Sequence, residues 1–262
     1  MSVAAGQDTI AAAFAAAPGR AALMPYLMGG FPDLETSRAI GEAYAESGAD
    51  LVELGVPFSD PLADGPVIHA AGTQALEGGA TVPAVIELAR SLSERVPVIL
   101  MCYANLVLAR GVERFVDELE KAGVSGLIVP DLPLEEAPAT LAACDAAGLA
   151  LVPLVAPTTP EDRLARIGEQ ARGFVYTVSS TGTTGERADV DAGDLLARVK
   201  RHTAVPVALG FGISTPAQAA AAAAAGADGV IVGSRLVRAA AEGEDVRVVV
   251  EGLAGALSRA DA

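Results

Sequence analysis

The sequence predicts an α/β fold, a single (β/α)8 TIM barrel with an extra N-terminal helix and a C-terminal phosphate-binding region. Short β-branched runs alternate with longer helical patterns along the whole chain, which is typical of βα units that build a parallel sheet. Eight such runs occur in 262 residues, and one barrel typically needs about 250 residues. An open, doubly wound sheet gives the same alternation, but eight strands favour a closed barrel.

The expected elements follow one another without a linker, a repeat or a low-complexity tail, so residues 1–262 are expected to form one barrel domain. The strands are Ala22–Met28, Leu51–Val56, Val98–Tyr103, Gly126–Pro130, Ala150–Val155, Phe174–Val178, Val207–Gly210 and Gly229–Val232. The helices are an Ala-rich one within Met1–Arg20, then Leu34–Ser47, Val82–Arg95, Val112–Ala122, Leu134–Ala147, Pro160–Gln170, Asp194–His202, Thr215–Ala225 and a pair from Ser234 onward.

The connections predict which end of the barrel carries the site. Four helices end in a glycine step before the next strand, at Gly48, Gly123, Gly148 and Gly226, and glycine suits the left-handed conformation that ends a helix. The longer segments follow the strands and are expected to be loops on the opposite rim, where barrel active sites lie. They are Gly55–Gly79, Ala104–Gly111, Asp131–Pro133, Ala156–Thr159, Ser179–Val190, Gly210–Ser214 and Gly233–Ser234.

Composition narrows the range of partners. The formal net charge is −15, which makes nucleic acid and anionic membranes poor partners. The chain begins without a positively charged signal region, and the sequence contains no membrane span. Cys102 and Cys144 lie far apart in apolar segments, outside any CxxC motif. We therefore expect a reducing cytoplasm and an anionic ligand that is held locally by backbone donors.

Two carboxyl groups on the expected catalytic rim are the candidate acid/base pair. Glu53 lies inside an apolar strand, where burial raises the pKa of a carboxyl group towards neutrality, so that it can both give and take a proton. Asp64 follows in the loop above the strand. Two carboxyl groups in different environments can take different roles in one reaction. Taken singly, Glu53 also fits a buried structural carboxylate, and Asp64 before Gly65 also fits a turn.

Two glycine-containing loops late in the chain form the candidate phosphate site. Gly210–Ser214 follows the seventh strand, and Gly233–Ser234 follows the eighth strand and opens a helix. Loops at these places and a helix N-terminus are the usual phosphate site of such barrels. The alternative interpretation of the first loop is a tight turn with no role in phosphate binding. The long polar loop Ser179–Arg187 either closes over a substrate or is a plain surface loop.

Missing residue types limit the chemistry. Lys121 and Lys200 are the only lysines, and both fall in expected outer helices, so a Schiff-base aldolase has no candidate amine. His69 and His202 are too few and too scattered for a catalytic zinc site. No nucleotide-binding motif is present. Carbon–carbon cleavage would therefore depend on acid/base catalysis alone.

A long motif resembles one known family. Residues 53–66, ELGVPFSDPLADGP, are similar to the signature of tryptophan synthase alpha chains. The likeness continues through residues 101–105, 129–133, 183–185, 210–214 and 229–234, together with Tyr176, in the family's order. Two positions depart from the family pattern, since Thr183 stands where valine is common and Ser180 where some members have arginine.

This resemblance implies cleavage of indole-3-glycerol phosphate to indole and glyceraldehyde 3-phosphate, a retro-aldol reaction without metal or organic cofactor. It implies that Glu53 protonates indole C3 and helps to deprotonate the glycerol hydroxyl, and that Asp64 binds the indole N1–H. It further implies a pyridoxal-phosphate beta subunit as partner in an α2β2 heterotetramer. The implied substrate-binding residues are Tyr26, Met101, Tyr103, Tyr176, Thr184, Gly185, Phe211, Gly212, Gly233 and Ser234.

Three alternatives remain open on the sequence. A phosphosugar isomerase or epimerase on a related barrel would share the phosphate loops but would need no indole pocket. A regulatory subunit would keep the barrel only to activate a partner, although retention of both carboxyl groups argues against it. A free-standing lyase would release indole without any beta subunit.

Overall fold

Nine parallel strands form one sheet in the computed structural model, which describes residues 6–17, 19–178, 192–210 and 212–257. In chain order the strands are β1 (Ala22–Met28), β2 (Val52–Gly55), β3 (Val98–Met101), β4 (Gly126–Ile128), β5 (Ala150–Val152), β6 (Leu154–Val155), β7 (Val175–Val178), β8 (Val207–Gly210) and β9 (Gly229–Val232). Their order in the sheet is β5-β4-β3-β2-β1-β9-β8-β7-β6. Only Pro153 separates the two edge strands, β5 and β6, and its nitrogen carries no hydrogen for the ladder. The edges are thus one interrupted strand, which confirms the expected eight-stranded barrel.

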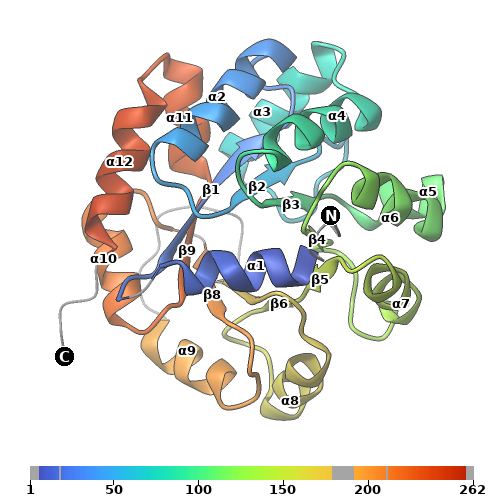
Figure 1. Cartoon of the computed structure of the whole chain (residues 1–262), viewed down its shortest axis with the longest axis vertical. Helices are drawn as coiled ribbons and strands as arrows, with labels where there is room; N and C mark the ends of the chain where they lie inside the picture. Colours follow the sequence, from blue (N-terminus) through green and yellow to red (C-terminus); the bar gives the residue numbers. More distant parts are fainter. Residues whose placement is uncertain (1–5, 18, 179–191, 211, 258–262) are drawn as a thin grey trace.

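Helices surround this barrel, and α1 lies across one end of it (Figure 1). They are α1 (Gly6–Ala15), α2 (Leu34–Glu46), α3 (Pro66–Glu77), α4 (Val82–Ser93), α5 (Ala104–Arg110), α6 (Val112–Lys121), α7 (Pro138–Ala146), α8 (Glu161–Gln170), α9 (Ala192–Lys200), α10 (Pro216–Ala224), α11 (Ser234–Glu242) and α12 (Val246–Ala256). Most of them lie where the sequence predicts a helix. The regular alternation of strand and helix therefore persists along the described chain.

Two segments expected to be loops contain helices. The Gly55–Gly79 segment holds α3, which starts with Pro66 at its first position and buries Ile68, Ala71 and Ala75 at helical spacing. The Ala104–Gly111 segment is almost entirely α5. Both expectations were wrong because each helix lies directly after a strand, where a loop is the usual connection, and is followed by a second helix before the next strand.

One helix starts later than expected. The segment Leu134–Ala147 becomes helical only at Pro138, which is the first residue of α7. A proline inside a helix removes a backbone hydrogen bond and clashes with the preceding turn, so the helix begins at the proline.

The N-terminal end of the barrel is closed by apolar packing. Ile10 of α1 is fully buried in one cluster with inward-facing side chains of the strands, among them Met24, Leu51, Ile99 and Phe174. The four glycine steps lie at this same end, and all adopt the left-handed backbone that the sequence predicts, with φ of +100° at Gly48, +73° at Gly123, +71° at Gly148 and +99° at Gly226. The loops after the strands are therefore left to form the other rim.

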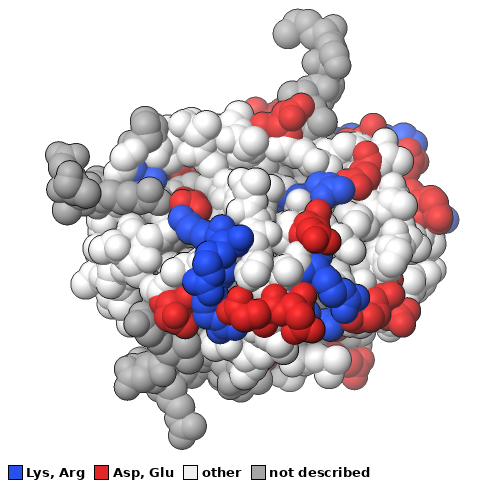
Figure 2. All heavy atoms as spheres, turned by 90° about the horizontal axis from the view of Figure 1, so that it is seen from below, with Lys and Arg blue, Asp and Glu red and all other residues white. Residues whose placement is uncertain are grey.

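The outer surface intermixes acidic and basic side chains. Figure 2 shows this on the face seen from below the view of Figure 1, where α8 and α9 lie. Glu135 pairs with Arg163 of α8, and Glu161 of α8 pairs with Arg198 of α9 and with His202. Basic groups on this face therefore have acidic neighbours and form no patch of a single sign. No helix of the described part is long and apolar enough to cross a membrane.

Candidate active site

Glu53 is a buried carboxyl group inside the barrel. Alternation along β2 directs Val52 and Leu54 outward to the helices, so that Glu53 points inward with Leu51. The side chain is 1 % exposed, and its buried oxygen Oε2 has no hydrogen-bond partner among the described residues. Burial, aided by the nearby negative charge of Asp64, raises the Glu53 pKa to about 8. Much of this group is therefore protonated at neutral pH.

Asp64 lies half-buried in the loop between β2 and α3. The Tyr103 hydroxyl donates a hydrogen bond of 2.8 Å to Asp64 Oδ1 and accepts one of 3.0 Å from the Ala63 amide. Burial raises the Asp64 pKa, whereas the Tyr103 hydrogen bond and His69 lower it. The two carboxyl groups thus occupy different environments, one without a partner and one hydrogen-bonded.

Two tyrosines lie over glycines of neighbouring strands. A Cβ atom added at Gly55 would lie 2.0 Å from the Tyr26 hydroxyl, and one added at Gly210 would lie 2.4 Å from the Tyr176 hydroxyl. Tyr26 is in register with Glu53, so its phenol reaches across to the glycine two residues further along β2. The two glycines provide the space that each ring fills. Residues with side chains at these positions would displace the tyrosines from the site.

These side chains form one electrostatic cluster. Burial raises the pKa of Tyr26 well above its ordinary value, and the charges of Asp64 and Glu53 raise it further. Tyr176 is shifted in the same direction by burial and by Glu53. The structure therefore brings together five residues that the sequence singled out, which are Tyr26, Glu53, Asp64, Tyr103 and Tyr176. Met101 lies partly buried beside them, packed against the groups that contain Tyr26 and Tyr176.

The expected phosphate turn lies next to this cluster. Gly233 caps the N-terminus of α11, and Ser234 is the first residue of that helix. A Cβ added at Gly233 would meet Tyr26 Cβ at 3.6 Å, which is ordinary contact. Gly212 after β8 is exposed and has a φ of +77°. A helix N-terminus offers free amide donors and a positive dipole end, which suit a phosphate. The other expected binding residues Thr184, Gly185 and Phe211 lie outside the described residues.

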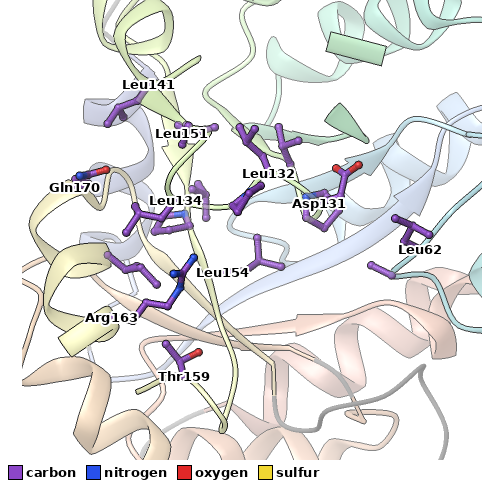
Figure 3. Close-up of a pocket in the computed structure, with 18 residues that line it drawn as sticks. Leu62, Asp131, Leu132, Leu134, Leu141, Leu151, Leu154, Thr159, Arg163 and Gln170 are labelled. Carbon is purple, nitrogen blue, oxygen red and sulfur yellow. The ribbon is translucent and has the colours of Figure 1, made fainter. Parts of the chain in front are cut away.

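A cavity of about 620 Å³ opens beside the cluster. Figure 3 shows it running from Leu62 and Asp131 to Leu141 and Gln170, with mostly leucine side chains around it. Leu62 and its neighbour Ala63 belong to the loop that carries Asp64, but neither Glu53 nor Asp64 lines the cavity. The cavity therefore adjoins the carboxyl pair and does not contain it. Sequence reasoning missed this feature because it depends on the separation of α7 and α8.

Both lysines and His202 lie away from the cluster, whereas His69 is near enough to Asp64 to lower its pKa. Lys121 on α6 pairs with Asp117, and Lys200 on α9 pairs with Asp228. His202 contacts Glu161 on the outer surface, while His69 is exposed on α3. Among the described residues no three His, Cys, Asp or Glu side chains lie close enough together to hold a metal ion.

A (β/α)8 barrel with a buried, protonatable carboxyl group and a second carboxyl group in the loop above it defines an acid/base enzyme of the barrel class. Residues 13–257 match the family model described as tryptophan synthase alpha chain. The chain is 53% identical to the tryptophan synthase alpha chain of Prochlorococcus marinus over 226 residues, which cover 85% of this chain and 82% of that one. Its identity with the Methanosarcina mazei alpha chain is 50% over 235 residues, covering 89% and 86%.

Solved structures agree with these relatives. A structure of Mycobacterium tuberculosis tryptophan synthase matches with a TM-score of 0.91 and 42% identity, covering 95% of this chain and 98% of that chain. A structure of the tryptophan synthase α2β2 complex from Pyrococcus furiosus matches with a TM-score of 0.84 and 37% identity, covering 90% and 99%. The chain belongs to the tryptophan synthase alpha chain family.

Membership settles the class of reaction. The alpha subunit of tryptophan synthase cleaves indole-3-glycerol phosphate in tryptophan biosynthesis, so the chain is a carbon–carbon lyase of that pathway. The resemblance seen in the sequence is confirmed. The isomerase and the purely regulatory subunit are set aside as alternatives.

Proposed function

We propose that Glu53 and Asp64 carry the retro-aldol cleavage of indole-3-glycerol phosphate between them. Glu53 gives its proton to indole C3, and Asp64 accepts a hydrogen bond from N1–H and offsets the positive charge that develops on the ring. The Glu53 carboxylate then takes the proton of the glycerol hydroxyl on the carbon attached to C3. The carbon–carbon bond breaks, its electron pair returns to the indole ring, and glyceraldehyde 3-phosphate leaves with its new carbonyl group. Glu53 ends the cycle protonated, as it began.

The burial of Glu53 beside Asp64, with one carboxyl oxygen lacking a partner among the described residues, carries this assignment, because it raises the Glu53 pKa to about 8. A carboxyl group that titrates near neutral pH exists in both forms during turnover, so one side chain can serve as acid and then as base. Its Oε2 atom has no partner among the described residues and is available to a substrate.

The substrate fits between two parts of the rim. The indole ring would lie among Tyr26, Met101, Tyr103 and Tyr176, which the structure gathers around the carboxyl pair. The phosphate would bind the amides of Gly233 and Ser234 at the N-terminus of α11, together with Gly212. This orientation places the reacting bond beside Glu53.

The partner is a pyridoxal-phosphate beta subunit in an α2β2 assembly. The C-terminal rim has exposed apolar side chains suited to docking, since Leu62 is 79% exposed and Leu108 is 62% exposed. The cavity in Figure 3 lies along the same rim and includes Leu62, Asp131 and Pro133. The Pyrococcus furiosus relative is known as an α2β2 complex in which the subunits activate one another.

The compartment is the cytoplasm, and residues 1–262 work as one domain. Cys102 and Cys144 are both free and buried, which suits a reducing compartment. All described strands belong to a single sheet, which favours one folding unit.

The test is an indole-release assay on the chain alone and mixed with its cognate beta subunit. We expect slow release alone, faster release in the complex, and co-elution of the two chains, because docking favours the closed state of the site. Asp64→Asn should be severely impaired in both settings, because an amide cannot offset charge on the indole nitrogen. Full speed without a complex would identify a free-standing lyase, and normal turnover in Asp64→Asn would remove Asp64 from the mechanism.

A further inference from the structure

Tyr103 is enclosed by the loop that carries Asp64. Its ring stacks on Phe58 with centroids 5.2 Å apart and planes 29° apart. Its hydroxyl accepts a hydrogen bond from the Ala63 amide and donates one to Asp64 Oδ1. All three contacts come from the segment 58–64, so the ring and the hydroxyl hold both ends of one short loop.

Tyr103 is itself held by the barrel. It lies two residues after the end of β3 and is the N-cap residue of α5. The amide of the next residue, Ala104, donates to Asp131 Oδ1 at 2.8 Å, and the amide of the preceding Cys102 donates to the carbonyl of Ile128 in β4 at 3.0 Å. Backbone hydrogen bonds on both sides of Tyr103 thus hold it to β4 and to the segment that follows β4, whereas Asp64 lies on a loop.

Within the described residues, the Tyr103 hydroxyl is the hydrogen-bond donor to the Asp64 carboxylate. It engages Oδ1 and leaves Oδ2 for another ligand. A loop carboxylate without this donor would sample several orientations, and a misplacement of about 1 Å can cost a hundredfold in rate. Tyr103 is therefore placed to orient the Asp64 carboxylate in addition to lining the pocket.

We propose that Tyr103 is the positioning residue for Asp64, holding one carboxylate oxygen so that the other meets the indole N1–H. This inference rests on the function proposed above for Asp64. It predicts an effect on turnover, because the substrate contacts of the ring remain in a phenylalanine variant. If Tyr103 only lined the pocket, loss of its hydroxyl would leave kcat unchanged, and only removal of the ring would weaken substrate binding.

The pH dependence supplies an independent signature. The Tyr103 hydrogen bond favours the ionised form of Asp64 and lowers its pKa, so removal of the hydroxyl raises that pKa. The low-pH limb of kcat/KM should move to higher pH, while the high-pH limb, set by Glu53, should stay in place. Other titratable groups face Tyr103 and Asp64 from the neighbouring elements, and the substitution leaves these residues in place. They are Tyr26, Glu53, His69 and Asp131.

The experiment compares Tyr103→Phe with Tyr44→Phe in the complex with the beta subunit, using indole-3-glycerol phosphate as substrate. Tyr44 is a buried tyrosine on α2 outside the site, so its variant makes the same chemical change without touching Asp64. We expect kcat of Tyr103→Phe to fall roughly 10- to 100-fold, as for loss of a hydrogen bond to a charged group, with KM almost unchanged. Tyr44→Phe should keep the wild-type kcat and pH profile.

A second background tests whether Tyr103 acts through Asp64. In Asp64→Ala the carboxylate is absent, so adding Tyr103→Phe should cost no further rate. Additive losses, or a Tyr103→Phe variant with unchanged kcat and low-pH limb, would overturn the inference. Absence of cleavage by the wild-type chain would count against the proposed function instead. Circular dichroism and thermal midpoints of every variant identify any loss caused by misfolding.

Discussion

The two carboxyl groups of the candidate site and two aspartates at the opposite end of the barrel have contrasting partners. At the N-terminal end, Asp50 accepts two hydrogen bonds from the Arg20 guanidinium, at 2.7 and 2.6 Å, and one from the Leu23 amide at 2.8 Å. Asp228 repeats the pattern with the Lys200 ammonium at 2.8 Å and a neighbouring strand amide, that of Val207, at 2.9 Å. Both aspartates end a Gly-Ala-Asp step, two residues before β2 at Asp50 and directly before β9 at Asp228, so the same local motif connects two pairs of neighbouring strands.

At the C-terminal end, the two carboxyl groups of the candidate site have no ion pair among the described residues. Glu53 Oε2 has no partner in the described residues, and Asp64 is held by a neutral phenol. A carboxylate paired with a cation stabilises the fold, whereas a buried carboxyl group without such a partner costs stability; at Glu53 burial also raises the pKa to about 8, which suits proton exchange. Substitutions at the two ends should therefore have opposite consequences for activity and for folding.

The largest expected effect is on catalysis. Glu53→Gln keeps the shape of the side chain but removes its titratable proton, and an acid/base group typically contributes about 10²- to 10⁴-fold. We expect indole release to fall by that factor in the saturated complex. Near-normal turnover would break the comparison, because it would make Glu53 a structural residue like Asp50.

The same substitution should stabilise the protein at high pH. The folded-state pKa of Glu53 is about 8 against an ordinary 4.5, so the stability associated with its protonation is fully present below about pH 4.5 and is lost as the pH rises towards 8. Glu53→Gln escapes this loss. Its free energy of unfolding should therefore exceed that of the wild type by roughly 4 kcal/mol above pH 8, and the gap should close on acidification. Urea titrations across this range measure it; a gap independent of pH contradicts the buried, neutral carboxyl group.

A smaller effect is expected at the phosphate turn. Gly233→Asp puts a carboxylate beside the N-terminus of α11, in a position where a Cβ meets only ordinary contacts. We expect glycerol phosphate to bind about 10- to 100-fold more weakly, whereas indole should bind almost as before. Gly233→Asn is the matched control for size, and calorimetric titration gives both affinities. Equal losses for the two ligands would indicate a local folding defect.

The smallest expected effect on activity is at the opposite end. Asp50→Asn removes the charge that Arg20 engages and should lower the free energy of unfolding by about 1 to 3 kcal/mol, because hydrogen bonds to charged groups are lost. The folded fraction should retain wild-type kcat. Thermal unfolding measures the change in stability, and the indole assay measures kcat. A loss of kcat below the unfolding temperature would show that Asp50 influences the candidate site at the other end of the barrel.

Much of the fold follows from short-range patterns. The runs Val207–Gly210 and Gly229–Val232 are strands with the predicted bounds, because each is a short apolar run that contains valine or isoleucine and ends next to or at a glycine. The helices α3 and α5 were missed because they lie inside segments where a loop is the usual connection. The small residues of α3 and the short length of α5, seven residues, give a weaker helical pattern than that of α4 or α6.

Only part of the candidate site could likewise be predicted from the sequence. Glu53 could be predicted because a charge inside an apolar strand is unusual in itself. The hydrogen bond between Tyr103 and Asp64 could not, since 39 residues separate them and the sequence indicates only that both lie on one rim. The space that Gly55 and Gly210 leave for two tyrosines was also missed, because a glycine in a motif is first interpreted as a turn residue.

The tyrosine cluster also makes the chain its own optical reporter. The sequence contains four tyrosines and no tryptophan, and three of those tyrosines, Tyr26, Tyr103 and Tyr176, surround the carboxyl pair. Ultraviolet emission from the alpha subunit therefore originates mainly in the site itself, without the background that tryptophan gives in most enzymes. Quenching of this emission would report ligand entry, and the separate emission of released indole would report its departure, so both can be followed on an unlabelled chain.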